Sequence, residues 1–166
     1  DKYNKFDAKA YKFYTLADYY TFKFFATGGY VAGYGGENVR LSDRYYLGGQ
    51  TLRGFEFAGI GARDKRTDDA LGGNWMMYSG AEMTFPIGLD ELGIKGRTFW
   101  DIGMLGKPDN FDAKKIDYSS KVRSSVGFGF DWMSPMGKID IDFGFPISKT
   151  KYDKTEVFRL NFGTSL

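Results

Sequence analysis

Arg53 is the residue whose surroundings point most directly to chemistry. The stretch around it, YLGGQTLRGFEF at 46–57, has neither strand nor helix periodicity. Glycine adopts backbone conformations that other residues avoid, so this stretch is predicted to be a tightly bent loop. An Arg on such a loop carries a planar fork of donors that suits a bidentate grip on a carboxylate. Taken alone, however, these residues favour a simpler interpretation, in which Arg53 is a solvated loop residue.

The sequence lacks the residues that most catalytic mechanisms require. The 166 residues include no His and no Cys, which removes the commonest general base, thiolate metal ligands and nucleophilic pairs that depend on His. Asp140 and Asp142 share one face of a predicted strand, and we interpret them as solvated lining. We therefore expect no enzyme, no catalytic residue, no metal and no cofactor. The net charge of +2 is scattered along the chain and indicates no nucleic-acid partner.

The elements that position Arg53 are predicted to be strands, because apolar and polar residues alternate strictly over long stretches. We predict seven strands in one domain, at 3–14, 20–34, 75–85, 94–104, 122–132, 139–145 and 156–166. The intervening segments alternate between short turns and long loops. The longest loops, at 35–72 and 106–118, are predicted to be irregular, and the first of them carries Arg53.

The two faces of these strands differ in a way that favours a membrane barrel. One face is rich in large aromatics with almost no charge, and the other carries Lys, Arg, Asp, Glu and Gly. A polar interior, an apolar exterior, and turns that are short at one end and long at the other are typical of outer-membrane barrels. A soluble antiparallel sandwich or barrel remains the alternative. No run of ~18 apolar residues predicts a transmembrane helix.

An odd number of strands fits poorly with a complete bacterial barrel. Either one strand escapes detection, or the chain is part of a larger barrel. The sequence opens Asp1-Lys2-Tyr3 without an apolar segment, so no signal peptide is visible and we expect a processed or truncated piece.

Three motifs resemble those of the Omp85 superfamily, and within it the branch that assembles outer-membrane barrels. Leu52-Arg53-Gly54-Phe55, after the Gly48-Gly49 pair, resembles the family's [V/L]RG[F/Y] motif in the sixth extracellular loop. The stretch 99–103, FWDIG, resembles its F-x-D-x-G strand motif. The stretch 131–137, DWMSPMG, resembles its W-x-S-P-x-G turn near the C-terminus. Their order and spacing match as well, so the resemblance covers essentially the whole chain.

The resemblance implies an all-β, transmembrane antiparallel barrel fold. Residues 1–166 would be the C-terminal part of a 16-stranded barrel domain, with seven to eight strands present, a long inserted loop and no POTRA domains. The implied function is assembly and insertion of β-barrel proteins in the bacterial outer membrane. The implied partners are outer-membrane lipid, unfolded client proteins and accessory subunits of the barrel assembly machinery. Alternatives are a translocation pore of the TamA or two-partner secretion type and a small structural barrel.

The resemblance also implies roles for individual residues. In the family, the Arg of the loop motif enters the barrel lumen and pairs with the Asp of the strand motif, which predicts Arg53 against Asp101. Glu82 is a second inward carboxylate for the same Arg. Gly54 is expected to let the loop approach the wall and Phe55 to pack inside, with Phe99 and Gly103 forming the receiving surface.

Two further groups of residues belong to this expectation. The last strand would form a seam that opens to clients, with Gly163 as a weak point; its residues are Phe158, Leu160, Phe162, Gly163 and Leu166. The chain departs from the family pattern here, because it ends in Leu166 where an aromatic is common. The turn motif, Trp132, Ser134, Pro135 and Gly137, is expected to serve as turn chemistry with an interfacial aromatic, without a chemical role.

Overall fold

The computed structural model describes residues 3–16, 19–35, 38–109, 111–119 and 121–163. Within them, one antiparallel sheet contains seven strands in the order β1-β2-β5-β6-β8-β9-β10. Their bounds are β1 Tyr3–Leu16, β2 Tyr20–Gly33, β5 Trp75–Pro86, β6 Ile94–Leu105, β8 Arg123–Ser134, β9 Gly137–Ser148 and β10 Phe158–Gly163. The predicted all-β antiparallel architecture is confirmed. The sheet is open, with β1 and β10 at its edges.

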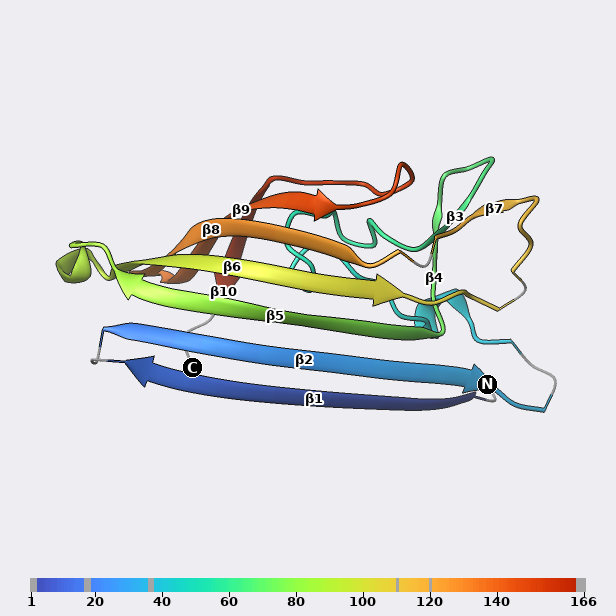
Figure 1. Ribbon diagram of the computed structural model, residues 1–166, viewed down its shortest axis with the longest axis horizontal. Coiled ribbons are helices and arrows are strands. Elements are labelled where there is room, and N and C mark those ends of the chain that lie inside the picture. The colour runs from blue at the N-terminus through green and yellow to red at the C-terminus, as the bar shows by residue number, and fades with distance from the viewer. Residues whose placement is uncertain (1–2, 17–18, 36–37, 110, 120, 164–166) are drawn as a thin grey trace.

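The loops follow the predicted alternation. Figure 1 shows the long connections after β2, β6 and β9 at one end of the sheet and the short turns at the other. Side chains alternate as predicted: aromatics such as Phe6, Trp100 and Phe128 are 69%, 48% and 47% exposed on the outer face, which suits contact with lipid. Among the described residues, no helix combines the length and apolar character that crossing a bilayer requires.

The long loops contain more regular structure than the sequence predicted. The segment 35–72 includes the 3-10 turn η1 Leu41–Asp43 and the short strands β3 Ala62–Asp64 and β4 Ala70–Gly72. The loop predicted at 106–118 contributes β7 Ile116–Asp117, and a second 3-10 turn, η2 Asp90–Leu92, lies between β5 and β6. Strands β4, β3 and β7 form a second small sheet. Elements of two or three residues are too short for periodicity to reveal.

The last strand is shorter at its start than predicted. β10 begins at Phe158 rather than at 156, because Glu156 N donates to the Gly54 carbonyl of the inserted loop, whereas Val157 O still accepts from Gly144 N of β9. Leu166, assigned to this strand from the sequence, lies outside the described residues.

We call the face of the sheet that carries Asp101 the inner wall. The main apolar core lies between this wall and the inserted loop, residues 35–72. It is built by Val31, Val39, Tyr45, Leu47, Leu52, Phe55, Ile60, Met76 and Leu105. Leu52 and Phe55 are 0% and 1% exposed, and burial of side chains of this size stabilises by roughly 1.5–3 kcal/mol each. The loop is therefore a packed part of the fold, and it carries Arg53 to the centre of the sheet.

Candidate functional site

Arg53 and Asp101 form a bidentate ion pair on the inner wall. Arg53 Nε and Nη2 each donate to one carboxylate oxygen of Asp101, both at 2.8 Å. The Arg53 backbone N–H adds a third bond, at 3.0 Å to Oδ2. The side chains are only 10% and 1% exposed, so the pair is largely removed from water and is stronger than a surface pair. The structure thus places Arg53 against the inner wall of the sheet, at the Asp101 of the F-x-D-x-G motif.

Phe99 and Gly103 complete the receiving surface on β6. The Arg53 guanidinium carbon lies 3.9 Å from the centroid of the Phe99 ring, a cation–π contact. Gly103 leaves room for the loop, since a Cβ there would lie 3.3 Å from Leu52. All three motif residues of β6 therefore face the loop, as alternation along a strand requires.

Glu82 supplies a second carboxylate to Arg53. Its Oε1 lies 2.5 Å from Arg53 Nη1, and Glu82 pairs with Phe99 across the β5–β6 ladder. With Asp101 on one side and Glu82 on the other, the Nε, Nη1 and Nη2 atoms of Arg53 all have anionic acceptors. This arrangement holds the guanidinium in one orientation.

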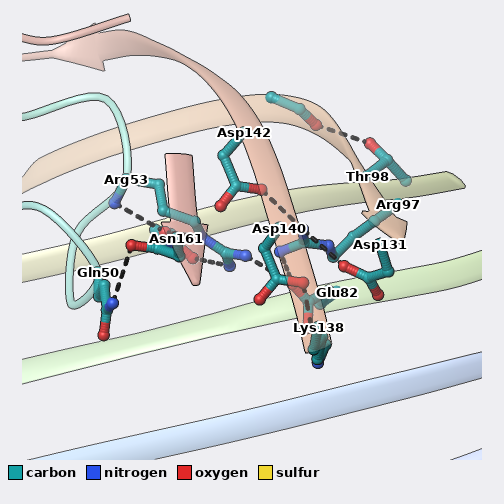
Figure 2. Close-up of polar contacts among 12 residues, drawn as sticks. Gln50, Arg53, Glu82, Arg97, Thr98, Asp131, Lys138, Asp140, Asp142 and Asn161 are labelled. Carbon is teal, nitrogen blue, oxygen red and sulfur yellow. Dashed lines mark hydrogen bonds and ion pairs between the residues drawn. The ribbon is translucent and has the colours of Figure 1, made fainter. Parts of the chain in front are cut away.

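Arg97 links Glu82 to two further strands, β8 and β9, and the sequence interpretation missed it. Its Nη1 lies 3.2 Å from Glu82, and its Nη2 lies 2.8 Å from Asp131 and 2.9 Å from Asp142. Figure 2 shows this network beside the loop, together with a bond from Gln50 to Asn161 of β10. Asp142 is therefore a buried ion-pair partner, not solvated lining. Inward charges of opposite sign on adjacent strands were the available signal.

Gly54 and Gly144 allow the loop to touch the wall. Gly54 has a φ of +96°, and a Cβ on Gly144 would lie 2.5 Å from Gly54 N. No side chain fits between backbones at this distance, so the loop rests on β9 through two glycines. The sequence predicted the role of Gly54, but nothing in it marked Gly144 as the counterpart.

A second segment, which we call the clasp (residues 154–157), lies beside the loop and bonds to its backbone. Glu56 N donates to Lys154 O at 3.0 Å, Lys154 N to Gly59 O at 2.8 Å and Glu156 N to Gly54 O at 3.0 Å. An isolated bridge also pairs Phe55 with Thr155. At the exposed end, Lys154 binds Asp68 at 2.6 Å and this hydrogen bond lowers the pKa of the Asp68 carboxyl. The loop is thus held by the bonds of Arg53 to the wall and by backbone bonds of its neighbours to the clasp.

The remaining predicted residues lie on β10 and at the turn between β8 and β9. Phe158, Leu160 and Phe162 are 51%, 43% and 74% exposed on the outer face of β10. Gly163, the last residue of β10, pairs with Lys138, and its role as a weak point stays a prediction. In the turn motif, Pro135 lies between Ser134 and Gly137; Ser134 Oγ donates to Gly137 O at 2.6 Å, and Gly137 has a φ of +123°. Trp132 is 37% exposed on the outer face, consistent with turn chemistry and an interfacial aromatic.

A polar cavity of about 380 Å³ lies beside Arg53 on the inner face. Its charged lining residues are Lys23, Arg53, Glu82, Arg97, Asp131, Lys138, Asp140 and Asp142. Most of these charges are paired with one another: Arg53 of the loop with Glu82, Arg97 with carboxylates of three strands, and Lys138 with Asp140 within β9. Such an arrangement fixes the loop against the wall, and the cavity extends to Asn161, Phe162 and Gly163 of the edge strand β10.

Comparison with known proteins identifies the family. The outer membrane protein assembly factor BamA of Neorickettsia risticii is 39% identical over 132 residues, covering 79% of this chain and 18% of that protein. BamA of Nitratidesulfovibrio vulgaris is 28% identical over 137 residues, covering 81% of this chain and 17% of that protein. The chain therefore spans less than a fifth of the length of these relatives.

Solved structures show the same fold. The crystal structure of BamA from Haemophilus ducreyi lacking POTRA domains 1–3 superposes with a TM-score of 0.79 at 24% identity, covering 96% of this chain and 34% of that one. The family model described as the Omp85 superfamily domain matches residues 1–166, which is the whole chain. This chain belongs to the Omp85 superfamily.

Proposed function

We propose that this chain is the part of an outer-membrane barrel that helps other β-barrel proteins fold and insert, without enzymatic chemistry. The relatives named above are outer membrane protein assembly factors, and the proposal extends that role to this chain. Its partners would be outer-membrane lipid, unfolded barrel clients and accessory subunits of an assembly machinery. The aromatic outer face supports a position in lipid.

The observation that carries the proposal is the placement of the Arg53 loop against an edge strand. β10 pairs only with β9 among the described residues, and Gln50 of the loop donates to Asn161 of β10 at 2.9 Å. A strand edge presents unpaired backbone donors and acceptors, which template the addition of another strand. Pairing of a client strand needs no nucleophile, acid or base, and the protein's contribution is to present the edge in one geometry.

The proposal is tested by reconstituting the full-length protein that carries this domain into liposomes. Folding of an unfolded client barrel is followed by its shift in mobility on unheated gels. Acceleration of client folding over protein-free liposomes supports the proposal. Client folding at the protein-free rate, with the reconstituted barrel itself folded, refutes it. Release of a soluble cargo across the bilayer without client insertion would instead identify a translocation pore.

A further inference from the structure

Arg123 and Asp153 form a second buried ion pair, separate from the Arg53 network. Arg123 Nε lies 3.0 Å from Asp153 Oδ2, and Arg123 Nη2 lies 3.1 Å from Oδ1. Their side chains are 1% and 0% exposed. A bidentate pair this deeply buried needs well-made partners, because removing two charges from water is costly. Neither residue belongs to any of the three motifs.

The remaining bonds of this pair join three segments of the chain. Arg123 Nη1 donates to the carbonyls of Ser119 and Lys121, at 2.9 and 2.6 Å, in the connection between β6 and β8. Arg123 itself begins β8. Asp153 Oδ2 also accepts the Thr150 N–H at 2.8 Å, which closes a turn in the connection after β9. The pair therefore fixes the β9–β10 connection to the start of β8.

The clasp begins at the residue after Asp153. Lys154 and Glu156 are the residues whose backbones bond to Glu56, Gly59 and Gly54 of the Arg53 loop. Directly after the clasp, Phe158 begins β10. Whatever fixes Asp153 thus fixes the clasp that bonds to the Arg53 loop.

We propose that Arg123 and Asp153 are positioning residues that hold the clasp over the Arg53 loop. This inference rests on the proposed function. In this proposal the two residues act through the backbone of the clasp and not by direct contact with a client strand. Arg is required at position 123 because its Nε and Nη2 bind the Asp153 carboxylate while its Nη1 donates to the carbonyls of Ser119 and Lys121. The single ammonium group of a Lys cannot make both sets of bonds. The loop is then held by one Arg–Asp pair at its tip and by another through the clasp.

Hydrogen exchange of the full-length protein in detergent tests the geometric part directly. The variant is Asp153→Asn, which removes the charge at nearly constant size, and Lys151→Ala is the matched control on an exposed residue of the same connection. We expect amide protection at Glu56, Lys154 and Glu156 to fall at least ~10-fold in Asp153→Asn, because these bonds open locally without global unfolding. Protection within β5 and β6 and throughout Lys151→Ala should match wild type. Unchanged protection at the three amides overturns the proposal.

Client-folding rates test the functional part. If Asp153 acts only through the Arg53 loop, the double variant Arg53→Ala/Asp153→Asn should fold clients no more slowly than Arg53→Ala alone. If the rate losses of the two single variants multiply in the double variant, the proposal is overturned. Arg123→Lys keeps the positive charge but loses the forked donors. The same two measurements on this variant should show smaller losses of amide protection and of client-folding rate. Failure of the proposed function gives a different result: liposomes that contain the wild-type protein would then not accelerate client folding.

Discussion

Asp101 binds both the guanidinium and the backbone N–H of Arg53. The side-chain bonds are 2.8 Å each and the backbone bond is 3.0 Å. One carboxylate on β6 therefore fixes the direction of the Arg53 side chain and the position of its backbone. The loop cannot rotate about this point without breaking all three bonds.

Replacing Arg53 by Lys is expected to loosen the loop although the charge is kept. A single ammonium cannot occupy the Nε and Nη2 positions together or stack as a plane on Phe99. Hydrogen exchange at Phe55, whose N–H bonds to Leu52, should rise in the full-length protein. The exposed Arg66 of the same connection is the control, and Arg66→Lys should leave this exchange unchanged. Full protection in Arg53→Lys would show that charge alone holds the loop.

The two carboxylates around Arg53 should differ in importance. Asp101 receives three of its bonds and Glu82 one, and Glu82 is shared with Arg97. Loss of one partner of a fully buried pair costs about 3–5 kcal/mol, and less where water reaches it. We expect Asp101→Asn to expose the loop to exchange and to slow client folding more than Glu82→Gln does. The reverse order would make Glu82 the primary partner.

Gly144→Ala should displace the loop from β9. The added Cβ would lie 2.5 Å from Gly54 N, closer than any real contact, and the obstacle is backbone that cannot swing away. The expected result is a folded barrel with lost amide protection at Glu156, which bonds to Gly54 O. Gly28→Ala in β2 is the control, because a Cβ there meets only Met76 O at 3.8 Å. Wild-type protection in Gly144→Ala would contradict the close approach.

Arg97→Gln should lower the stability of the barrel wall itself. It strands Asp142, whose side chain is 4% exposed, and removes the link between Glu82 and Asp131. We expect a loss of about 3 kcal/mol in the free energy of unfolding, the lower end for a buried pair that loses one partner. Denaturant unfolding of the full-length protein measures it. Lys138→Gln, from an exposed pair 3.8 Å apart, should cost ~0–1 kcal/mol. Equal effects would show that the Arg97 network is as weak as a surface pair.

The sequence predicted the wall better than it predicted the loop contacts. Strict alternation located all seven strands of the main sheet, because the two faces of each strand meet different environments. The pairing of Arg53 with Asp101 followed from a family resemblance, since residues so far apart along the chain carry no local sign of contact. The short strands β3, β4 and β7 escaped because two or three residues show no period.

The contacts that needed three dimensions were missed. In the sequence, Gly144 does not differ from other strand glycines, and only the structure shows that Gly54 packs against it. Arg123 likewise reads as an ordinary inward polar residue, and only the structure pairs it with Asp153. Asp142 was interpreted as solvated because its partner Arg97 lies two strands away, on β6, with β8 between them. These residues depend on sheet register, and register cannot be derived from the alternation of a single strand.

We propose that the Arg53 loop, docked on the wall, is needed for barrel assembly. The most direct measurement is the rate of client folding in liposomes that contain the full-length protein with wild-type Arg53 or with Arg53→Ala. We expect the rate to be at least ~10-fold lower for Arg53→Ala, while the variant remains a folded barrel in the membrane. Folding of clients at the wild-type rate by a correctly inserted Arg53→Ala protein would contradict it.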